Sequence, residues 1–282
     1  MSERTGDFVL ADPAPETINF IGDSQLRLLG GRLFVDPLKP DRRIITQARW
    51  RPYFRASTFF YDGRFDEHMT RVFWDLKCTV RARDNLTDLF TPLTLRIFND
   101  ATEELYFRPS ETMPSTVISC GGVDSWDIEQ ELYPDFSFEV EDPPALFDAL
   151  PAYQAPTQLG YGEVRARIEA RIEPLFTGLR ALRDAGFSRL YVLGMPPPSL
   201  EMREHWKPVR MRYATRLTLE RIYKRFCATE GIGFIPIWDL LSTSDGLRDQ
   251  SLFRDAEHFD LKALPRLIGR VDTIVHERDR HA

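Results

Sequence analysis

Short, nearly all-apolar segments alternate with amphipathic segments of helical period along most of this chain, and this alternation limits its possible folds more than any other feature. Apolar strands of this kind are typical of a parallel sheet whose two faces are both covered by helices. The sequence therefore predicts an α/β fold, with all 282 residues in a single domain. We expect five strands, at residues 17–22, 57–61, 115–120, 189–193 and 233–238.

Helices are expected between and after these strands. The clearest extends from about residue 162 to 185, where apolar residues fall on one face at helical spacing and Gly186 follows as a helix-ending glycine. Pro174 should bend this helix or mark its restart, because proline lacks an N–H donor. Further helices are expected at about 209–228 and 261–276, and a short one at 25–30.

Two segments depart from this alternating pattern. Residues 64–114 carry many large apolar side chains without a clean period, so we expect helices together with an insertion or lid there. Residues 1–16 are polar and contain proline, and we expect them to be flexible. Both segments would lie outside the regular α/β framework.

The charge and the cysteine content argue against several classes of protein. With 43 acidic against 37 basic residues, the net charge is −6, which argues against binding of nucleic acid through its phosphates. No apolar run is long enough to cross a bilayer, so we expect neither a membrane span nor a secretory signal. Cys78, Cys120 and Cys227 form no disulfide or zinc spacing, which predicts reduced thiols and a cytoplasmic location. Cys120 ends a predicted strand and is expected to be a buried hydrophobic residue rather than a nucleophile.

Metal and nucleotide sites are not indicated. Asp66, Glu67 and His68 are adjacent, and adjacent residues on a helix point in different directions, so we expect a solvated surface rather than a metal site. No glycine-rich nucleotide-binding string occurs. We therefore expect no metal and no other cofactor. His205 and Trp206 could line a substrate cleft, although a surface position is the simpler expectation.

Polar residues follow predicted strands at the sheet edge where α/β proteins place their reactive groups. After the first strand, Gly22-Asp23-Ser24 lie where a strand passes into a helix, and the free N–H groups of a first helical turn can stabilise a developing negative charge. Ser24 could thus be a nucleophile whose own backbone N–H binds an oxyanion. Alternatively, Asp23 or Ser24 could simply cap the helix.

Asp255 and His258 precede the last predicted helix and could supply the base that a serine nucleophile needs. An imidazole base needs a partner on Nδ1 that fixes its tautomer and stabilises its charged form. A turn with two intervening residues lets the Asp255 carboxylate reach Nδ1 while Nε2 faces outward. The alternative is a solvated histidine on an acidic loop.

Together, these blocks resemble the SGNH (GDSL) hydrolase family. Phe20-Ile21-Gly22-Asp23-Ser24 is similar to the first block of that family, residues 117–124 to its third, and Asp255 to His258 to its fifth. The resemblance covers residues 17–274 apart from the irregular middle. It implies a flavodoxin-like three-layer α/β/α sandwich with a parallel five-stranded sheet. It also implies that Ser24 is the nucleophile, His258 the general base and Asp255 the residue that orients the base.

The oxyanion-binding part of the site departs from the family pattern. The third block of the family reads Gly-x-Asn-Asp, whereas this chain has Gly121-Gly122-Val123-Asp124, and Val123 cannot donate the hydrogen bond of the asparagine. Some relatives carry Gly-Glu-Ile-Asp there, so the departure resembles a subfamily trait. The second-block glycine of the family would be Gly63. We assign Gly63, Gly122 and Asp124 to oxyanion and substrate binding, and expect Asp124 to hydrogen-bond within its own turn rather than react.

The resemblance implies a serine ester hydrolase that acts through an acyl-enzyme on a short-chain ester, with an acetyl ester of a small molecule or saccharide as the expected substrate. Attack by a sugar hydroxyl instead of water would give an acyltransferase with the same residues. Val123 also leaves open a catalytically silent domain that binds a saccharide or a protein partner. No oligomeric state is indicated by the sequence.

Overall fold

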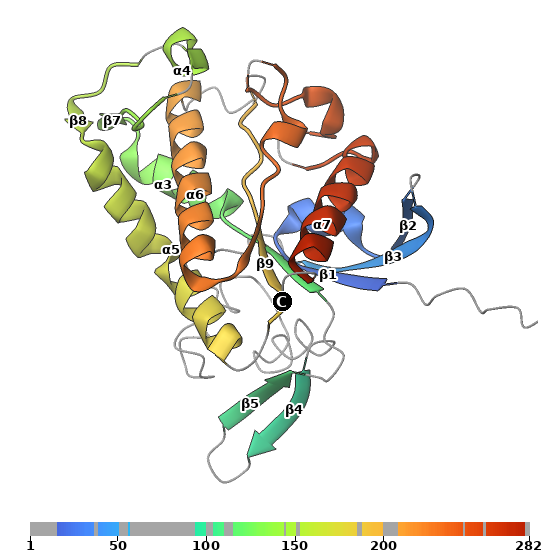
Figure 1. Cartoon of the computed structure of the whole chain (residues 1–282). Helices are drawn as coiled ribbons and strands as arrows, with labels where there is room; N and C mark the ends of the chain where they lie inside the picture. Colours follow the sequence, from blue (N-terminus) through green and yellow to red (C-terminus); the bar gives the residue numbers. More distant parts are fainter. Residues whose placement is uncertain are drawn as a thin grey trace, which may run out of the picture.

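The computed structural model describes residues 16–36, 39–50, 56, 94–99, 104–109, 115–143, 145–150, 153–184, 188–199, 208–244, 246–255 and 258–279. Its centre is a six-stranded sheet in the order β10-β9-β6-β1-β3-β2 (Figure 1). Five of these strands are parallel, and β2 pairs antiparallel with β3 at one edge. The predicted α/β fold with a parallel sheet is confirmed, whereas the predicted number of five strands is wrong because β2 adds an antiparallel sixth.

Four strands of the sheet coincide with predicted ones. They are β1 (Glu16–Gly22), β6 (Ser115–Ser119), β9 (Leu190–Leu193) and β10 (Gly233–Ile235). The strand predicted at 57–61 lies outside the described residues. On that side β1 pairs instead with β3 (Lys39–Trp50), which the sequence did not predict, and β3 in turn pairs with the edge strand β2 (Arg32–Asp36).

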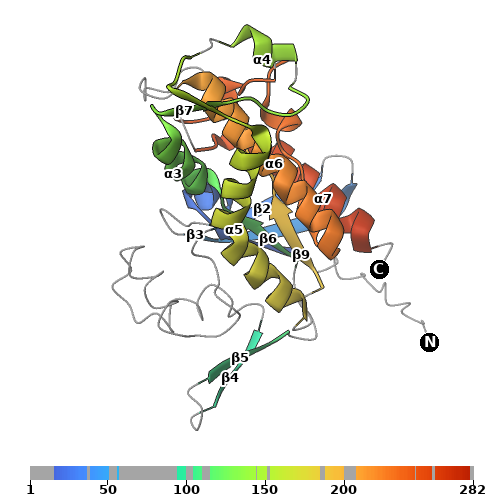
Figure 2. The same cartoon turned by 90° about the vertical axis from the view of Figure 1, so that its left-hand side faces the viewer.

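Helices cover both faces of the sheet (Figures 1 and 2). The helices α3 (Gly122–Leu132), α5 (Tyr161–Asp184) and α6 (Val209–Glu230) share one core with strand residues such as Ile21 and Ile118. The helix α7 (Leu264–Asp279) and the short 3-10 helix η1 (Ser24–Leu29) share the other core with Phe20 and Val117. Because neighbouring residues of a strand point to opposite faces, an all-apolar strand contributes to both cores.

The three longest helices match their predicted positions. The segments 162–185, 209–228 and 261–276 correspond to α5, α6 and α7, and a 3-10 turn, η5 (Leu261–Ala263), precedes α7. α5 continues without interruption through Pro174, so this residue does not mark a restart of the helix. The segment 25–30 forms a 3-10 helix, η1, that begins one residue earlier than predicted.

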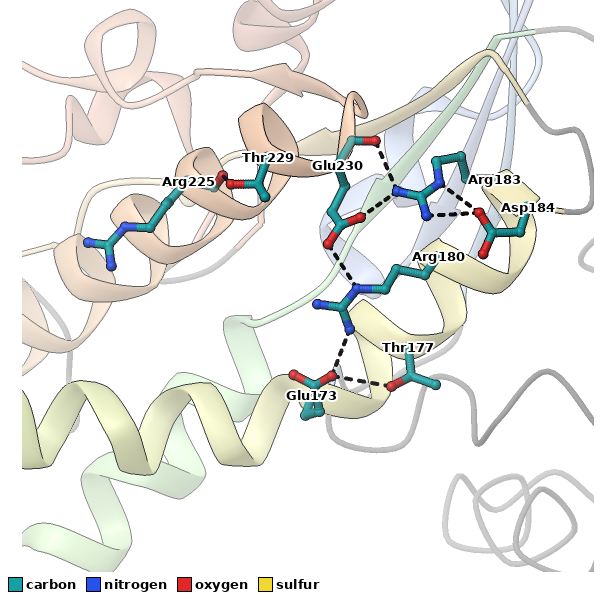
Figure 3. A network of polar contacts seen from close by, with 8 residues as sticks. All are labelled: Glu173, Thr177, Arg180, Arg183, Asp184, Arg225, Thr229 and Glu230. Atoms are coloured by element: carbon teal, nitrogen blue, oxygen red, sulfur yellow. Dashed lines mark hydrogen bonds and ion pairs between the residues drawn. The ribbon is translucent and has the colours of Figure 1, made fainter.

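α5 and α6 pack together through aromatic rings and ion pairs. The rings of Phe176 and Phe226 stack with their centroids 3.9 Å apart. Near the end of α6, the Glu230 carboxylate accepts hydrogen bonds from Arg180 at 2.9 Å and from Arg183 (Figure 3). Arg180 and Arg183 hold the pKa of Glu230 below its usual value. Water reaches these partly exposed charges and screens them, so the apolar contact contributes most of the stability of this helix pair.

Smaller elements lie around this framework. Within the predicted insertion at 64–114, the structure describes β4 (Thr94–Asn99) and β5 (Glu104–Pro109), which pair antiparallel and project from the main body in both views (Figures 1 and 2). The remaining elements are β7 (Phe136–Phe138), α4 (Ala145–Ala149), β8 (Thr157–Leu159), η3 (Asp239–Leu241) and η4 (Gln250–Leu252). No helix in the described part of the chain is long and apolar enough to cross a membrane.

Candidate active site

Ser24 lies immediately beyond the carboxyl end of β1, at the first position of η1. Its neighbour Asp23 caps this helix, because the Asp23 Oδ1 atom accepts the Gln25 N–H at 3.0 Å. Of the two capping residues that the sequence allowed, the structure therefore uses Asp23. The Ser24 hydroxyl is directed toward His258, with 3.0 Å between Ser24 Oγ and His258 Nε2.

Gly22 allows β1 and β6 to approach closely just before Ser24. A Cβ atom at this position would lie 1.8 Å from the carbonyl oxygen of Ser119, so no larger residue fits without moving a strand. The next residue continues the contact, since the Asp23 N–H donates to the same carbonyl oxygen at 3.1 Å. The turn that carries Ser24 is thus fixed against the end of β6.

Asp255 holds His258 at its imidazole and at its backbone N–H. The two carboxylate oxygens of Asp255 lie 2.8 and 2.9 Å from His258 Nδ1, and Oδ1 also accepts the backbone N–H of His258 at 2.9 Å. The carboxylate therefore favours the tautomer with a proton on Nδ1, which leaves Nε2 to accept a proton from Ser24. The His258 side chain is 32% exposed and that of Asp255 44%, so the pair faces solvent at the rim of the site.

Two buried phenylalanines anchor the turn that carries Asp255 and His258. Phe253 and Phe259 form an isolated antiparallel bridge, one on either side of the turn. Their rings pack in the same core as α7, with their centroids 5.5 Å apart. Two backbone hydrogen bonds close the same turn, from Arg254 N–H to His258 O at 2.9 Å and from Asp260 N–H to Leu252 O at 2.8 Å. Asp255 and His258 thus lie between two residues, Phe253 and Phe259, that are paired with each other and buried in the core.

The residues after β6 pack directly against the turn of Ser24. Gly121 has φ of 110°, a conformation that favours glycine, and a Cβ atom there would lie 2.6 Å from the hydroxyl oxygen of Tyr223. A Cβ atom on Gly122 would lie 3.4 Å from both Asp23 Oδ2 and Gln25 Nε2. Two small residues thus bring the first turn of α3 next to η1.

Asp124 connects α3 to the chain that follows β3. It is fully buried, and its Oδ2 atom accepts the backbone N–H of Ala56, also buried, at 2.6 Å. This partner lies 68 residues away, so Asp124 makes a long-range contact, while the hydrogen bond within its own turn stays a prediction. Because this contact is with the protein backbone, it fits a residue that holds the structure around the site in place.

The other residues that the sequence singled out fall into two groups. Cys120 is buried in the core beside α6, and burial together with the nearby charges of Asp124 and Asp23 raises the pKa of its thiol well above the usual value. This agrees with its expected part as an inert core residue. Gly63, the Asp66-Glu67-His68 segment, His205 and Trp206 lie outside the described residues.

Two polar residues were not singled out from the sequence, one beside Ser24 and one just after β9. Gln25 follows Ser24 and is buried, and the only signal in the sequence was an amide side chain among the leucines of a short helix. Glu220 on α6 is partly buried at the end of β9, where its Oε2 atom accepts the Met195 N–H at 2.6 Å. Burial raises the pKa of Glu220 to about 7. Gly194 at the end of β9 makes room for this carboxyl group.

Comparison with known proteins finds distant similarity in overall structure only. No family model and no curated protein matches the chain. It is similar to a solved acetyl xylan esterase, with a TM-score of 0.46 and 10% identity over 91% of this chain and 98% of that one. It is also similar to a GDSL-like lipase from Bacteroides thetaiotaomicron (TM-score 0.44, 10% identity, 95% of this chain and 93% of that one). An extracellular lipase from Streptomyces rimosus is a third (TM-score 0.43, 12% identity, 90% of this chain and 98% of that one). All three TM-scores are below 0.5, so this similarity says nothing about the chemistry of the site.

Proposed function

We propose that this protein is a serine ester hydrolase of the SGNH (GDSL) type, with Ser24 as nucleophile, His258 as general base and Asp255 as its orienting partner. The observation that carries the proposal is the continuous contact from Ser24 Oγ to His258 Nε2, at 3.0 Å, and from His258 Nδ1 to Asp255, at 2.8 Å. A hydroxyl, an imidazole and a carboxylate in this order form the arrangement that activates a serine for acyl transfer.

The first half of the reaction forms an acyl-enzyme. His258 Nε2 removes the proton of the Ser24 hydroxyl while Oγ attacks the carbonyl carbon of the ester, and the carbonyl π electrons move onto oxygen. The Ser24 N–H, at the first position of η1, donates to this oxyanion. When the intermediate collapses, the bond to the leaving alcohol breaks, and His258 returns the proton to that alcohol.

The second half of the reaction regenerates the serine. Water loses a proton to His258 Nε2 and attacks the acyl carbon, and collapse of the second intermediate releases the acid and returns the proton to Ser24 Oγ. Asp255 stabilises the imidazolium that forms in both halves, because its carboxylate already contacts Nδ1. The exposure of His258 at the rim of the site gives water access to Nε2.

We further propose a short-chain acyl ester as the substrate, with an acetyl ester of a carbohydrate as the first class to test. A sugar hydroxyl that replaced water in the second half would make the protein an acyltransferase with the same residues. The contact between Ser24 and His258 favours either activity over a domain that only binds a saccharide or a protein, for which Val123 is the sole argument.

The test combines an active-site label with an ester assay. A fluorophosphonate probe should label the wild-type protein, and p-nitrophenyl acetate should be hydrolysed. Ser24→Ala should abolish labelling, and Ser24→Ala and His258→Asn should each lower kcat by roughly 10⁴–10⁶-fold. Acetate release from acetylated sugars, with and without an added sugar acceptor, separates hydrolysis from transfer.

Matched substitutions away from the site provide the controls. Ser188 is exposed just before β9, at the end of the sheet opposite to Ser24, so Ser188→Ala should keep wild-type labelling and turnover. His276 on α7 provides the corresponding control, His276→Asn. Wild-type turnover by Ser24→Ala would end the proposal.

A further inference from the structure

An oxyanion site in this protein lacks one obvious hydrogen-bond donor. The apolar Val123 occupies the first turn of α3, where the resemblance places an asparagine, and its side chain has nothing to donate. The Asp124 carboxylate next to it only accepts hydrogen bonds when ionised. Loss of one oxyanion donor typically costs about 10²–10³ in rate, so an active enzyme needs another group in this place.

Gln25 has a side chain of the required chemistry beside the nucleophile. It follows Ser24 on the same turn and is only 7% exposed. Its backbone N–H serves the Asp23 cap, whereas its side-chain amide takes part in no hydrogen bond within the described part of the chain. Neither amide atom is among the fully enclosed side-chain atoms that lack a partner, so the amide is within reach of solvent and can donate to a group that enters the site.

The position of the Gln25 amide fits the missing donor. The Gln25 Nε2 atom lies 3.4 Å from the point where a Cβ atom of Gly122 would be, and Gly122 is the residue that directly precedes Val123. The absence of a side chain at Gly122 leaves this space to the amide. The NH2 group of Gln25 is therefore located between the turn of the nucleophile and the first turn of α3.

We propose that Gln25 is a catalytic residue whose Nε2–H donates a hydrogen bond to the carbonyl oxygen of the substrate, in place of the asparagine that Val123 replaces. This inference rests on the proposed ester hydrolysis at Ser24. As Oγ bonds to the carbonyl carbon, negative charge develops on the oxygen, and the Ser24 N–H and the Gln25 amide stabilise it together. The charge returns to the carbonyl bond when the alcohol leaves, so the Gln25 amide keeps its proton throughout.

The decisive variant is Gln25→Met, which keeps the length of the side chain and removes the donor. We expect kcat for p-nitrophenyl acetate to fall by about 10²–10³, with KM changed by less than about threefold, because the bond strengthens only in the transition state. Labelling by the fluorophosphonate, which forms a tetrahedral adduct, should slow in parallel. Gln158→Met, at an exposed position on β8, is the matched control and should behave as wild type.

A second-site change separates a donor from a packing residue. Val123→Asn in the Gln25→Met background supplies an amide from the first turn of α3 and should raise kcat at least about tenfold above Gln25→Met alone. Gln25→Glu keeps the shape of the side chain but places a carboxylate next to the oxyanion, so it should lower kcat at least as strongly as Gln25→Met.

The outcomes distinguish this inference from the proposed function. If Gln25→Met and Gln25→Glu keep wild-type kcat while Ser24→Ala is inactive, Gln25 is not an oxyanion donor. The proposed ester hydrolysis at Ser24 is unaffected by that result. A loss of kcat that Val123→Asn does not restore, together with a lowered thermal midpoint, would show that Gln25 serves packing and would also overturn the inference. Equal turnover by Ser24→Ala and wild type would remove the proposed function itself.

Discussion

Three consecutive residues, Gly22, Asp23 and Ser24, serve three separate needs at the end of β1. Gly22 permits the approach to Ser119, Asp23 caps η1, and Ser24 is left with its hydroxyl directed toward His258. The sequence could predict this turn because a short polar string after a buried strand has few structural uses. It could not decide which residue caps the helix, since aspartate and serine do so about equally well.

The double contact between Asp255 and His258 leads to a prediction about tautomers. In Asp255→Asn, the amide oxygen can still accept the His258 N–H, but an NH2 group at Nδ1 would favour the tautomer with the proton on Nε2. That tautomer cannot accept the serine proton. We expect kcat to fall by about 10³–10⁴ with little change in the thermal midpoint, as measured by steady-state kinetics and thermal unfolding. Unchanged kcat would show that Asp255 does not set the tautomer.

Asp124 gives a prediction about stability rather than chemistry. In Asp124→Leu, the buried Ala56 N–H loses its acceptor, which should cost about 1–3 kcal/mol in the free energy of unfolding measured with urea. Asp124→Asn retains an acceptor oxygen of the same size and should be destabilised less than Asp124→Leu. An equal loss in the two variants would mean that the hydrogen bond to Ala56 is not the stabilising contact.

Individual elements were predictable where both faces of a strand are buried. β1, β6, β9 and β10 are short apolar runs for this reason, and each was predicted within a few residues. β3 was not predicted because it carries charged residues such as Arg42 and Arg43, which interrupt the apolar pattern of a buried strand. In the folded protein, Arg42 forms an ion pair with Asp272 on α7. An ion pair formed only in the folded state leaves no apolar pattern in the sequence.

Glu220 on α6 predicts an unusual dependence of stability on pH. An unfolded glutamate ionises near pH 4.5, whereas burial keeps the Glu220 carboxyl protonated in the folded protein up to about pH 7. Between these values the unfolded state has lost a proton that the folded state retains, so the free energy of unfolding should decrease as pH rises, and the decrease should level off above about pH 7.

Glu220→Gln should remove this dependence, because an amide oxygen can accept the Met195 N–H without ionising. Urea unfolding at pH 5 and pH 8 should show wild type losing on the order of 3 kcal/mol more than Glu220→Gln over this range. Glu230→Gln, which alters an ion-paired glutamate on the same helix, should retain the wild-type decrease. If the free energy of unfolding of Glu220→Gln decreases with pH as steeply as that of wild type, Glu220 is not the source of the pH dependence.

At the scale of the whole molecule, the order of the strands explains why distant residues meet. From β1 the chain continues to β3 on one side and later to β6 on the other, so the carboxyl end of β1 lies where the direction of winding reverses. Such a point opens a crevice between the loops of neighbouring strands. The turn of Ser24, the first turn of α3 and Ala56 after β3 all gather there. The sequence predicted this edge but not Ala56 as a partner, because the contact joins residues 68 positions apart and uses a backbone N–H, which leaves no mark in the sequence.

The long separation along the chain between the proposed nucleophile and its base makes reactivity a property of the intact fold. Ser24 and His258 are 234 residues apart, and only the packed sheet and the turn beneath α7 bring them to 3.0 Å. In increasing urea, the rate of fluorophosphonate labelling should therefore fall over the same concentration range as near-ultraviolet circular dichroism, since both report the folded population. His258→Asn, which should remain folded, should stay unlabelled at every concentration. Labelling that persists beyond the loss of tertiary signal would mean that the probe reacts with a serine independently of this site.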